Sequence, residues 1–282
     1  MSESATNTTS DTPRVAVLGG GVMGGTIITA LRVAGWPADK IVVADHGDVR
    51  AAALQETHGI DATKEIAPAV DGADIVIICV KPQQVGQIMP DVSANLRDGA
   101  MVITVAAALS TSFYEERLPA GTPVVRAMPN TPSIVARGVT GIAAGANANQ
   151  AHLDLVAGML SAMGMVVAIE ESQIDALSAV SGSGPAYFYA MVEALTEAGV
   201  AQGLDRELST ALAAQTFIGA AHLLTETGDA PQTLRKRVSS PKGTTIAALD
   251  AMQAAGLQGV IAAGANAAVA RARALGLELN QD

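Results

Sequence analysis

The sequence predicts a two-domain protein with an α/β first half and an all-α second half. Short β-branched runs alternate with helical patterns up to about Ile169, and only helical periodicity follows. A glycine cluster comes directly after the first β-branched run. At 282 residues, 49% of them apolar, the chain has enough apolar material for two cores. We expect a disordered tail over residues 1–12, an α/β domain over 13–169 and a helical domain over 170–282.

The elements of the first half have lengths typical of a parallel sheet covered by helices on both faces. The expected strands are Val15–Leu18, Ile41–Ala44, Ile75–Val80, Met101–Val105, Val124–Ala127, Gly141–Ala143 and Met165–Ala168. The expected helices are Met23–Val33, Val49–Thr57, Val85–Leu96, Thr111–Arg117 and Gln150–Met163. In such sheets ligands bind beyond the carboxyl ends of the strands, so the loops there are the candidate site.

The second half shows long helical patterns without strands. The expected helices cover residues 171–180, 185–202, 206–227, 231–237, 244–254 and 256–275. The helix that begins at Pro185 carries only Glu193 and Glu197 as charges, so it should be buried on every side. A domain of this size cannot bury several such helices alone, which favours a homodimer or higher homo-oligomer. Packing of the helix against the first domain is the alternative.

Composition excludes several classes of partner and of site. A net charge of −10 gives no basic surface for nucleic acid or an anionic membrane. The single cysteine, Cys79, lies in an apolar run and is expected to be a buried thiol, and no histidine spacing predicts a metal site. The polar segment Met1–Thr12 lacks the features of a signal peptide. We therefore expect a cytoplasmic protein.

Residues 251–270 carry no charge, and this segment has nearly the length of a membrane span. Three glycines, Gly256, Gly259 and Gly264, interrupt this segment, and Ala dominates where Leu or Ile would be expected. A buried helix in a soluble assembly is the favoured interpretation, with a membrane span as the alternative.

The glycine cluster is a dinucleotide-binding motif. Gly19-Gly20-Gly21-Val22-Met23-Gly24 reads G-x-G-x-x-G between a strand and a helix, the setting in which the motif is specific. Gly19 permits the tight turn, Gly21 lets the backbone approach a pyrophosphate, and Gly24 allows close packing of helix on strand. The first domain is therefore expected to be of the Rossmann type.

The second strand ends at Asp45-His46, where adenosine ribose is usually recognised. An acidic residue there accepts a hydrogen bond from the 2′-hydroxyl of NAD, whereas a nearby Arg accommodates the 2′-phosphate of NADP. Asp45 favours NAD, and Arg50 lies one helical turn further on. The choice between NADP and NAD stays open.

Two Gly/Ser/Pro islands interrupt the helical half. The first island is Ser181-Gly182-Ser183-Gly184-Pro185-Ala186-Tyr187, and the second is Val238-Ser239-Ser240-Pro241-Lys242-Gly243-Thr244-Thr245. Each ends where a helix is expected to begin, and a helix N-terminus suits a bound carboxylate. In the second island, Ser240 and the stretch Gly243, Thr244 and Thr245 are the candidate carboxylate anchor. A simple helix cap is the alternative.

Together with the glycine cluster, these islands closely resemble the signatures of the pyrroline-5-carboxylate reductases, from about Arg14 to Leu277. The stretch Arg126-Ala127-Met128-Pro129-Asn130-Thr131-Pro132 also matches that family almost in full. The resemblance implies hydride transfer from NADPH or NADH to the C=N carbon of a cyclic imine carboxylate, which gives proline. It also implies that Val80-Lys81-Pro82, Ala106-Ala107 and Asn130 line the nicotinamide half of the cofactor. Lys81 as a merely solvated charge is the alternative for that side chain.

The resemblance implies a hydroxyl near the imine nitrogen just before the first island, where this chain has Ser178. The alternative is a helix serine bonded to its own backbone. This chain departs from the family at four positions: His46 stands for a usual Arg, Ile66 for Asn, Ala108 for Gly and Lys242 for Gly.

Two other functions share parts of this pattern. A β-hydroxyacid dehydrogenase relative would have the same layout, but it usually carries a catalytic Lys on the long central helix, and no Lys lies between Lys81 and Lys236. A non-catalytic nucleotide sensor would retain the first domain but would have no use for the second island.

Overall fold

The computed structural model describes residues 12–279, so the tail expected over residues 1–12 lies outside the described residues apart from Thr12. The chain forms two compact units. Among the described residues, the first covers 12–182 and 269–279, and the second covers Ser183–Ala268. The boundary predicted near Ile169 directly follows the last strand and stays a prediction.

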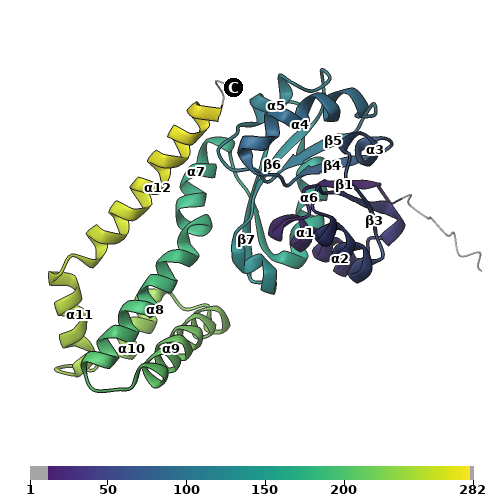
Figure 1. Cartoon of the computed structure of the whole chain (residues 1–282). Coiled ribbons are helices and arrows are strands. Elements are labelled where there is room, and N and C mark those ends of the chain that lie inside the picture. The colour runs from purple at the N-terminus through teal and green to yellow at the C-terminus, as the bar shows by residue number, and fades with distance from the viewer. Residues whose placement is uncertain (1–11, 280–282) are drawn as a thin grey trace, which may run out of the picture. The chain divides into compact units, whose positions relative to one another are not determined.

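The first unit is built on one eight-stranded sheet with the order β3-β2-β1-β4-β5-β6-β7-β8 (Figure 1). The strands are β1 Val15–Leu18, β2 Ile41–Ala44, β3 Asp61–Thr63, β4 Ile75–Ile78, β5 Met101–Thr104, β6 Val124–Met128, β7 Gly138–Ala144 and β8 Gly164–Ala168. All seven predicted strands are present. The additional strand, β3, is a three-residue edge strand without an apolar run, which is why the sequence did not indicate it.

The sheet is parallel except at one pair, which corrects the expectation of a parallel sheet. Strand β7 runs antiparallel to β6, while β8 is again parallel to β7. Only residues 129–137 connect β6 to β7, and their one regular element is the short 3-10 helix Thr131–Val135. A parallel return needs a crossover of a dozen or more residues, so this shorter connection reverses the chain direction.

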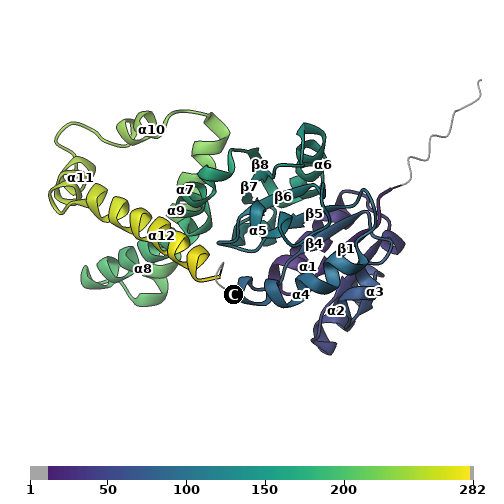
Figure 2. The same cartoon turned by 90° about the horizontal axis from the view of Figure 1, so that it is seen from above.

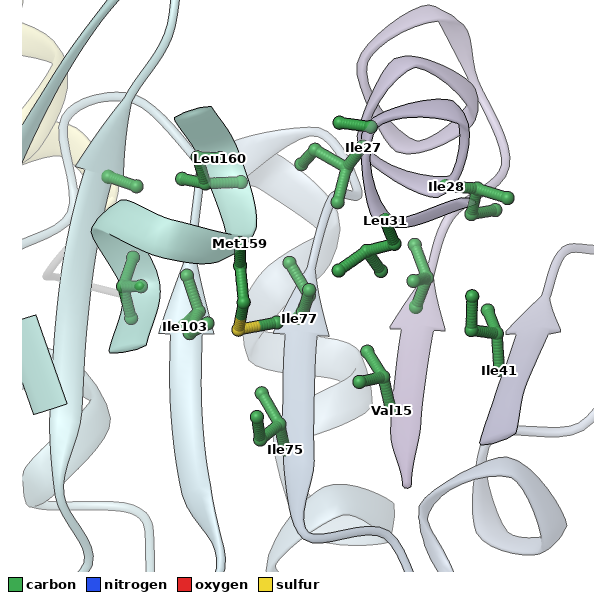
Figure 3. Packing of buried hydrophobic residues seen from close by; sticks show 14 of the residues in the cluster. Val15, Ile27, Ile28, Leu31, Ile41, Ile75, Ile77, Ile103, Met159 and Leu160 are labelled. Atoms are coloured by element: carbon green, nitrogen blue, oxygen red, sulfur yellow. The ribbon is translucent and has the colours of Figure 1, made fainter. Parts of the chain in front are cut away.

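Helices cover both faces of the sheet, as Figures 1 and 2 show. They are α1 Val22–Val33, α2 Asp48–His58, α3 Ile66–Val70, α4 Pro82–Asn95, α5 Thr111–Glu115 and α6 Gln150–Leu160. Helices α1 and α6 place Ile27, Leu31 and Met159 on one face of the sheet (Figure 3). Helices α3, α4 and α5 pack on the opposite face. Strand β1 contributes to both cores, because Val15 and Val17 point to one face while Ala16 and Leu18 point to the other.

The second unit is all-helical. It contains α8 Gly184–Ala201, α9 Arg206–Thr227, α10 Pro231–Arg237, α11 Thr244–Ala254 and the first part of α12 Leu257–Leu279. Helix α8 leaves large apolar side chains exposed in the single chain, including Phe188 at 48% and Tyr189 at 60%. One chain alone therefore does not bury α8 on every side, and these apolar side chains stay exposed unless another surface packs against them.

Helix α12 is, among residues 12–279, the one helix long and apolar enough to cross a membrane by length and composition. Those two properties are weak evidence, because core helices share them. The last turns of α12 belong to the first unit, where Arg273 lies 3.8 Å from the carboxylate of Asp175. Leu279 packs against the sheet core on the side of α3 to α5. This part of the helix thus makes polar and apolar contacts with protein.

Candidate active site

The glycine loop after β1 has the backbone geometry that a dinucleotide requires. Gly19 has a φ of +104°, and its N–H donates to the carbonyl of Ala44 at 2.8 Å. Positive φ favours glycine, so this position forms the tight turn. A side chain built at Gly21 would meet nothing within 4 Å, so the backbone there is open to a ligand. The loop therefore fits a pyrophosphate at the start of α1.

Gly24 holds the first helix against this loop. A Cβ atom at Gly24 would lie 1.9 Å from the carbonyl oxygen of Gly19. No side chain caps α1, and its first turn contains no acidic residue. The N-terminal N–H groups of α1 consequently have no competing carboxylate at the expected phosphate position.

Asp45 lies at the end of β2, with its side chain 6% exposed. Its carboxylate accepts hydrogen bonds from the N–H of Gly20 at 2.7 Å, the N–H of Gly47 at 2.6 Å and Nη2 of Arg50 at 2.8 Å. Burial opposes ionisation of this carboxyl, but these donors outweigh burial and hold its pKa below the ordinary value. Arg50 is thus paired with Asp45 and not free, while His46 is exposed.

The other predicted cofactor-binding loops follow β4, β5 and β6, which lie in that order beside β1 in the sheet. Val80-Lys81-Pro82 leads into α4 with Pro82 as its first residue, and Lys81 is exposed. Ala106 follows β5, and its N–H donates to the hydroxyl of Thr104 at 3.2 Å. Because these strands are parallel, all the predicted cofactor residues lie at the carboxyl ends of the strands, on one side of the sheet.

Cys79 lies next to the glycine loop, one residue beyond β4. Its N–H donates to the carbonyl of Leu18 at 2.8 Å. Burial raises the pKa of its thiol to about 12, so the thiol is inert at neutral pH.

Ser178 begins a π-helix, Ser178–Gly182, that follows α7 Ile174–Leu177. Over the described residues the Ser178 hydroxyl makes no hydrogen bond, in contrast to Ser181, whose hydroxyl donates to the carbonyl of Leu177 at 3.0 Å. The alternative of a serine bonded to its own backbone therefore applies to Ser181 and not to Ser178. π-Helical segments frequently occur at functional sites.

Asn130 connects this π-helix with the sheet. Its Nδ2 donates to the carbonyl of Ser181 at 2.9 Å, and its Oδ1 accepts from the N–H of Val139 at 2.8 Å. Asn130 is buried, at 8% exposure. The structure thus brings together Asn130, the segment of Ser178 and the start of β7.

Glu171, which is partly buried, and Arg126, which is buried, form a polar cluster that the sequence did not indicate. The Glu171 carboxylate accepts from the N–H and the hydroxyl of Thr111, each at 2.7 Å, and lies 3.4 Å from Nη1 of Arg126. The Arg126 side chain is 6% exposed. The match of Arg126 to a family motif was its only signal, because a distant carboxylate partner cannot be read from spacing along the chain.

The second island lies in the second unit. The N–H of Gly243 donates to the carbonyl of Ser240 at 2.9 Å, which closes a turn with Pro241 second and Lys242, at a φ of +60°, third. A positive φ at that position is typical of a type II turn and favours Gly. No side chain caps α11, and its first turn contains no acidic residue. The hydroxyls of this island therefore do not act as a helix cap in the chain itself.

Comparison with known proteins identifies the family. A model of pyrroline-5-carboxylate reductase dimerisation matches residues 171–275, and a model of NADP oxidoreductase, coenzyme F420-dependent, matches residues 14–108. A pyrroline-5-carboxylate reductase of Pseudomonas aeruginosa is 38% identical over 271 residues, which are 96% of this chain and 99% of the relative. The chain belongs to the pyrroline-5-carboxylate reductase family. Its predicted fold and its resemblance to these reductases are confirmed.

Further relatives agree with this assignment. A pyrroline-5-carboxylate reductase of Mycobacterium leprae is 40% identical over 93% of this chain and 96% of its own length. A solved pyrroline-5-carboxylate reductase structure from Coxiella burnetii superposes with a TM-score of 0.89 at 33% identity, covering 94% of this chain and 99% of that one. The reductase dimerisation region includes α8, whose apolar side chains are exposed in one chain. The expectation of a homo-oligomer is supported to that extent.

Proposed function

We propose that the chain reduces 1-pyrroline-5-carboxylate to L-proline with NADH or NADPH, the last step of proline biosynthesis. Membership of the reductase family across nearly the whole chain carries this proposal. This family membership favours a reductase function over that of a β-hydroxyacid dehydrogenase and over that of a non-catalytic nucleotide sensor. We further propose a cytoplasmic homodimer or larger homo-oligomer without a nucleic-acid or membrane partner.

The residues of the first unit bind and orient the cofactor in this proposal. The loop from Gly19 to Gly24 holds the pyrophosphate, Asp45 faces the adenosine ribose, and the segments at Val80 and Ala106 line the nicotinamide side. The reduced nicotinamide supplies the hydride when it is bound, so the protein contributes position and electrostatics. Ser178 offers a free hydroxyl to the imine nitrogen.

The second island binds the substrate carboxylate in this proposal. The N–H groups of Thr244 and Thr245 and the hydroxyls of Ser240 and Thr245 supply the donors, while the N–H of Gly243 closes the turn onto the Ser240 carbonyl. Support comes from the uncapped start of α11 and the lack of acidic side chains in its first turn. Lys242 adds a cation beside these donors but has a left-handed conformation, which costs a residue with a side chain about 1–2 kcal/mol.

Turnover with NADH is expected to be at least comparable to turnover with NADPH. The Asp45 carboxylate is fixed and ionised where a 2′-phosphate would approach, and Arg50 is engaged by that same carboxylate. Oxidation of NADH and of NADPH, each with pyrroline-5-carboxylate, measures the two kcat/KM values in parallel. No oxidation of either cofactor would refute the reductase proposal. A preference for NADPH above about tenfold, roughly 1.4 kcal/mol, would mean that Arg50 leaves Asp45 to bind the phosphate.

Thr245→Ala should raise KM for pyrroline-5-carboxylate at least several-fold, because a hydrogen bond to a charged group contributes about 1.5–3 kcal/mol. Proline should bind more weakly in parallel, while the Kd of the cofactor stays unchanged. Thr210→Ala is the matched control, since the exposed Thr210 hydroxyl only donates to the backbone carbonyl of Arg206 within α9. An unchanged KM with lowered thermal stability would make the second island a structural cap.

A further inference from the structure

The Asn130 amide joins two segments that are distant in sequence. Its Oδ1 is engaged by the N–H of Val139 at the start of β7, and its Nδ2 is engaged by the carbonyl of Ser181 inside the π-helix. Both bonds have ordinary lengths, and the residue is buried, so the amide orientation is fixed from both sides. Both polar atoms of the amide therefore make hydrogen bonds within the protein.

The π-helix that Asn130 holds has a specific relation to Ser178. A Cβ atom at Gly182 would lie 2.8 Å from the Ser178 hydroxyl oxygen, so that hydroxyl lies against Gly182. The Ser181 hydroxyl donates to the carbonyl of Leu177, and the Ser181 carbonyl accepts from Nδ2 of Asn130. The turn therefore satisfies Ser181 while it leaves the Ser178 hydroxyl free within the described structure.

We propose that Asn130 is a positioning residue, which holds the π-helix so that the Ser178 hydroxyl is presented to the substrate. This inference rests on the proposed reductase function and on the role of Ser178 in it. The i→i+5 hydrogen-bonding pattern is uncommon, and an ordinary α-helix would compete with it. Pro185 has no N–H, so the Ser181 carbonyl would lack its donor in an α-helix, and Nδ2 of Asn130 supplies the donor here.

Asn130→Asp tests the donor separately from the acceptor. The aspartate keeps an oxygen for the Val139 N–H, but it replaces the Nδ2 donor by an oxygen that faces the Ser181 carbonyl. We expect kcat to fall at least about tenfold and the Kd of NADH, from fluorescence titration, to change less than about threefold. The backbone amides of residues 181–184 and 186 should exchange hydrogen faster. Asn95→Asp is the matched control, since Asn95 makes one exposed amide-to-carbonyl bond, to Asp91 at 2.8 Å on α4.

A double-mutant cycle with Ser178→Ala decides whether Asn130 acts through Ser178. We expect Ser178→Ala alone to lower kcat about tenfold or more, and Asn130→Asp to change kcat less than about threefold in that background. Equal losses in both backgrounds, or an unchanged kcat in either single variant, would overturn the proposal while the reductase function stands. Should Asn130→Asp fail to fold, Asn130→Ala, which introduces no facing oxygen, enters the same cycle. Absence of turnover by the unaltered protein would refute the reductase function itself. The comparison of hydrogen-exchange rates would still test whether the Asn130 bond to Ser181 stabilises the π-helix.

Discussion

Gly24→Ala is expected to raise the Kd of NADH and NADPH at least about a hundredfold. The new Cβ atom would lie 1.9 Å from the carbonyl oxygen and 3.0 Å from the carbonyl carbon of Gly19. These are backbone atoms of the tight turn, so no flexible side chain can yield, and α1 must move away from the loop. That movement displaces the N–H groups that face the pyrophosphate. A hundredfold change corresponds to about 2.7 kcal/mol, within the range of forced overpacking.

Gly25→Ala is the matched control for this prediction. A Cβ atom at the neighbouring Gly25 would meet only the side chain of Leu54, at an ordinary 3.5 Å. Alanine also favours the helix by roughly 1 kcal/mol over glycine. Fluorescence titration of both variants with each cofactor measures the contrast, and circular dichroism confirms that they are folded. Equal affinities for the two variants would show that the loop does not hold the pyrophosphate as proposed.

The regular core of the fold could be predicted from the sequence, because strands buried on both faces leave continuous apolar runs. Strand β4, Ile75–Ile78, is fully apolar and was found at its correct start. Two short elements could not be found in this way. Strand β3 is an exposed edge strand, and α3, Ile66–Val70, has five residues with a proline among them. Their conformation follows from packing on β2 and α4, not from a local pattern.

The site could be predicted where a motif fixes backbone geometry, and not where distant residues meet. The loop from Gly19 to Gly24 has the conformation expected of it. The partners of Asp45 were beyond sequence reasoning, since its hydrogen bond from Gly20 joins two different loops. The same holds for Asn130, whose two partners come from β7 and the π-helix.

Two departures from the family motifs have a structural consequence. Ala108 and Lys242, which stand where the family usually has Gly, have φ angles of +71° and +60°. The backbone therefore keeps a left-handed conformation at both positions despite the side chains. Such residues cost about 1–2 kcal/mol, which the surrounding contacts must offset. Ala108 has such a contact, because a Cβ atom at Gly276 of α12 would lie only 2.7 Å from its carbonyl oxygen.

Glu171→Ala is expected to lower the free energy of unfolding of the first unit by about 3 kcal/mol. Removal of the carboxylate leaves the Arg126 cation, 6% exposed, without its ion pair. The Nε atom of Arg126 already has no hydrogen-bond partner within the described residues, so no internal group compensates. The N–H and hydroxyl of Thr111 lose their acceptor at the start of α5 as well. Urea unfolding followed by circular dichroism measures the shift in midpoint at an unchanged slope.

Glu116→Ala provides the matched control, because Glu116 forms an exposed pair with Arg117 at 3.9 Å and should contribute less than about 1 kcal/mol. The double variant Glu171→Ala with Arg126→Met separates the two causes of the loss. Methionine removes the buried charge, so stability should recover in part if the stranded cation dominates. No recovery would assign the loss to the Thr111 contacts and the start of α5. A Glu171→Ala protein as stable as the Glu116→Ala protein would contradict the prediction, since it would mean that water reaches Arg126 and replaces the carboxylate.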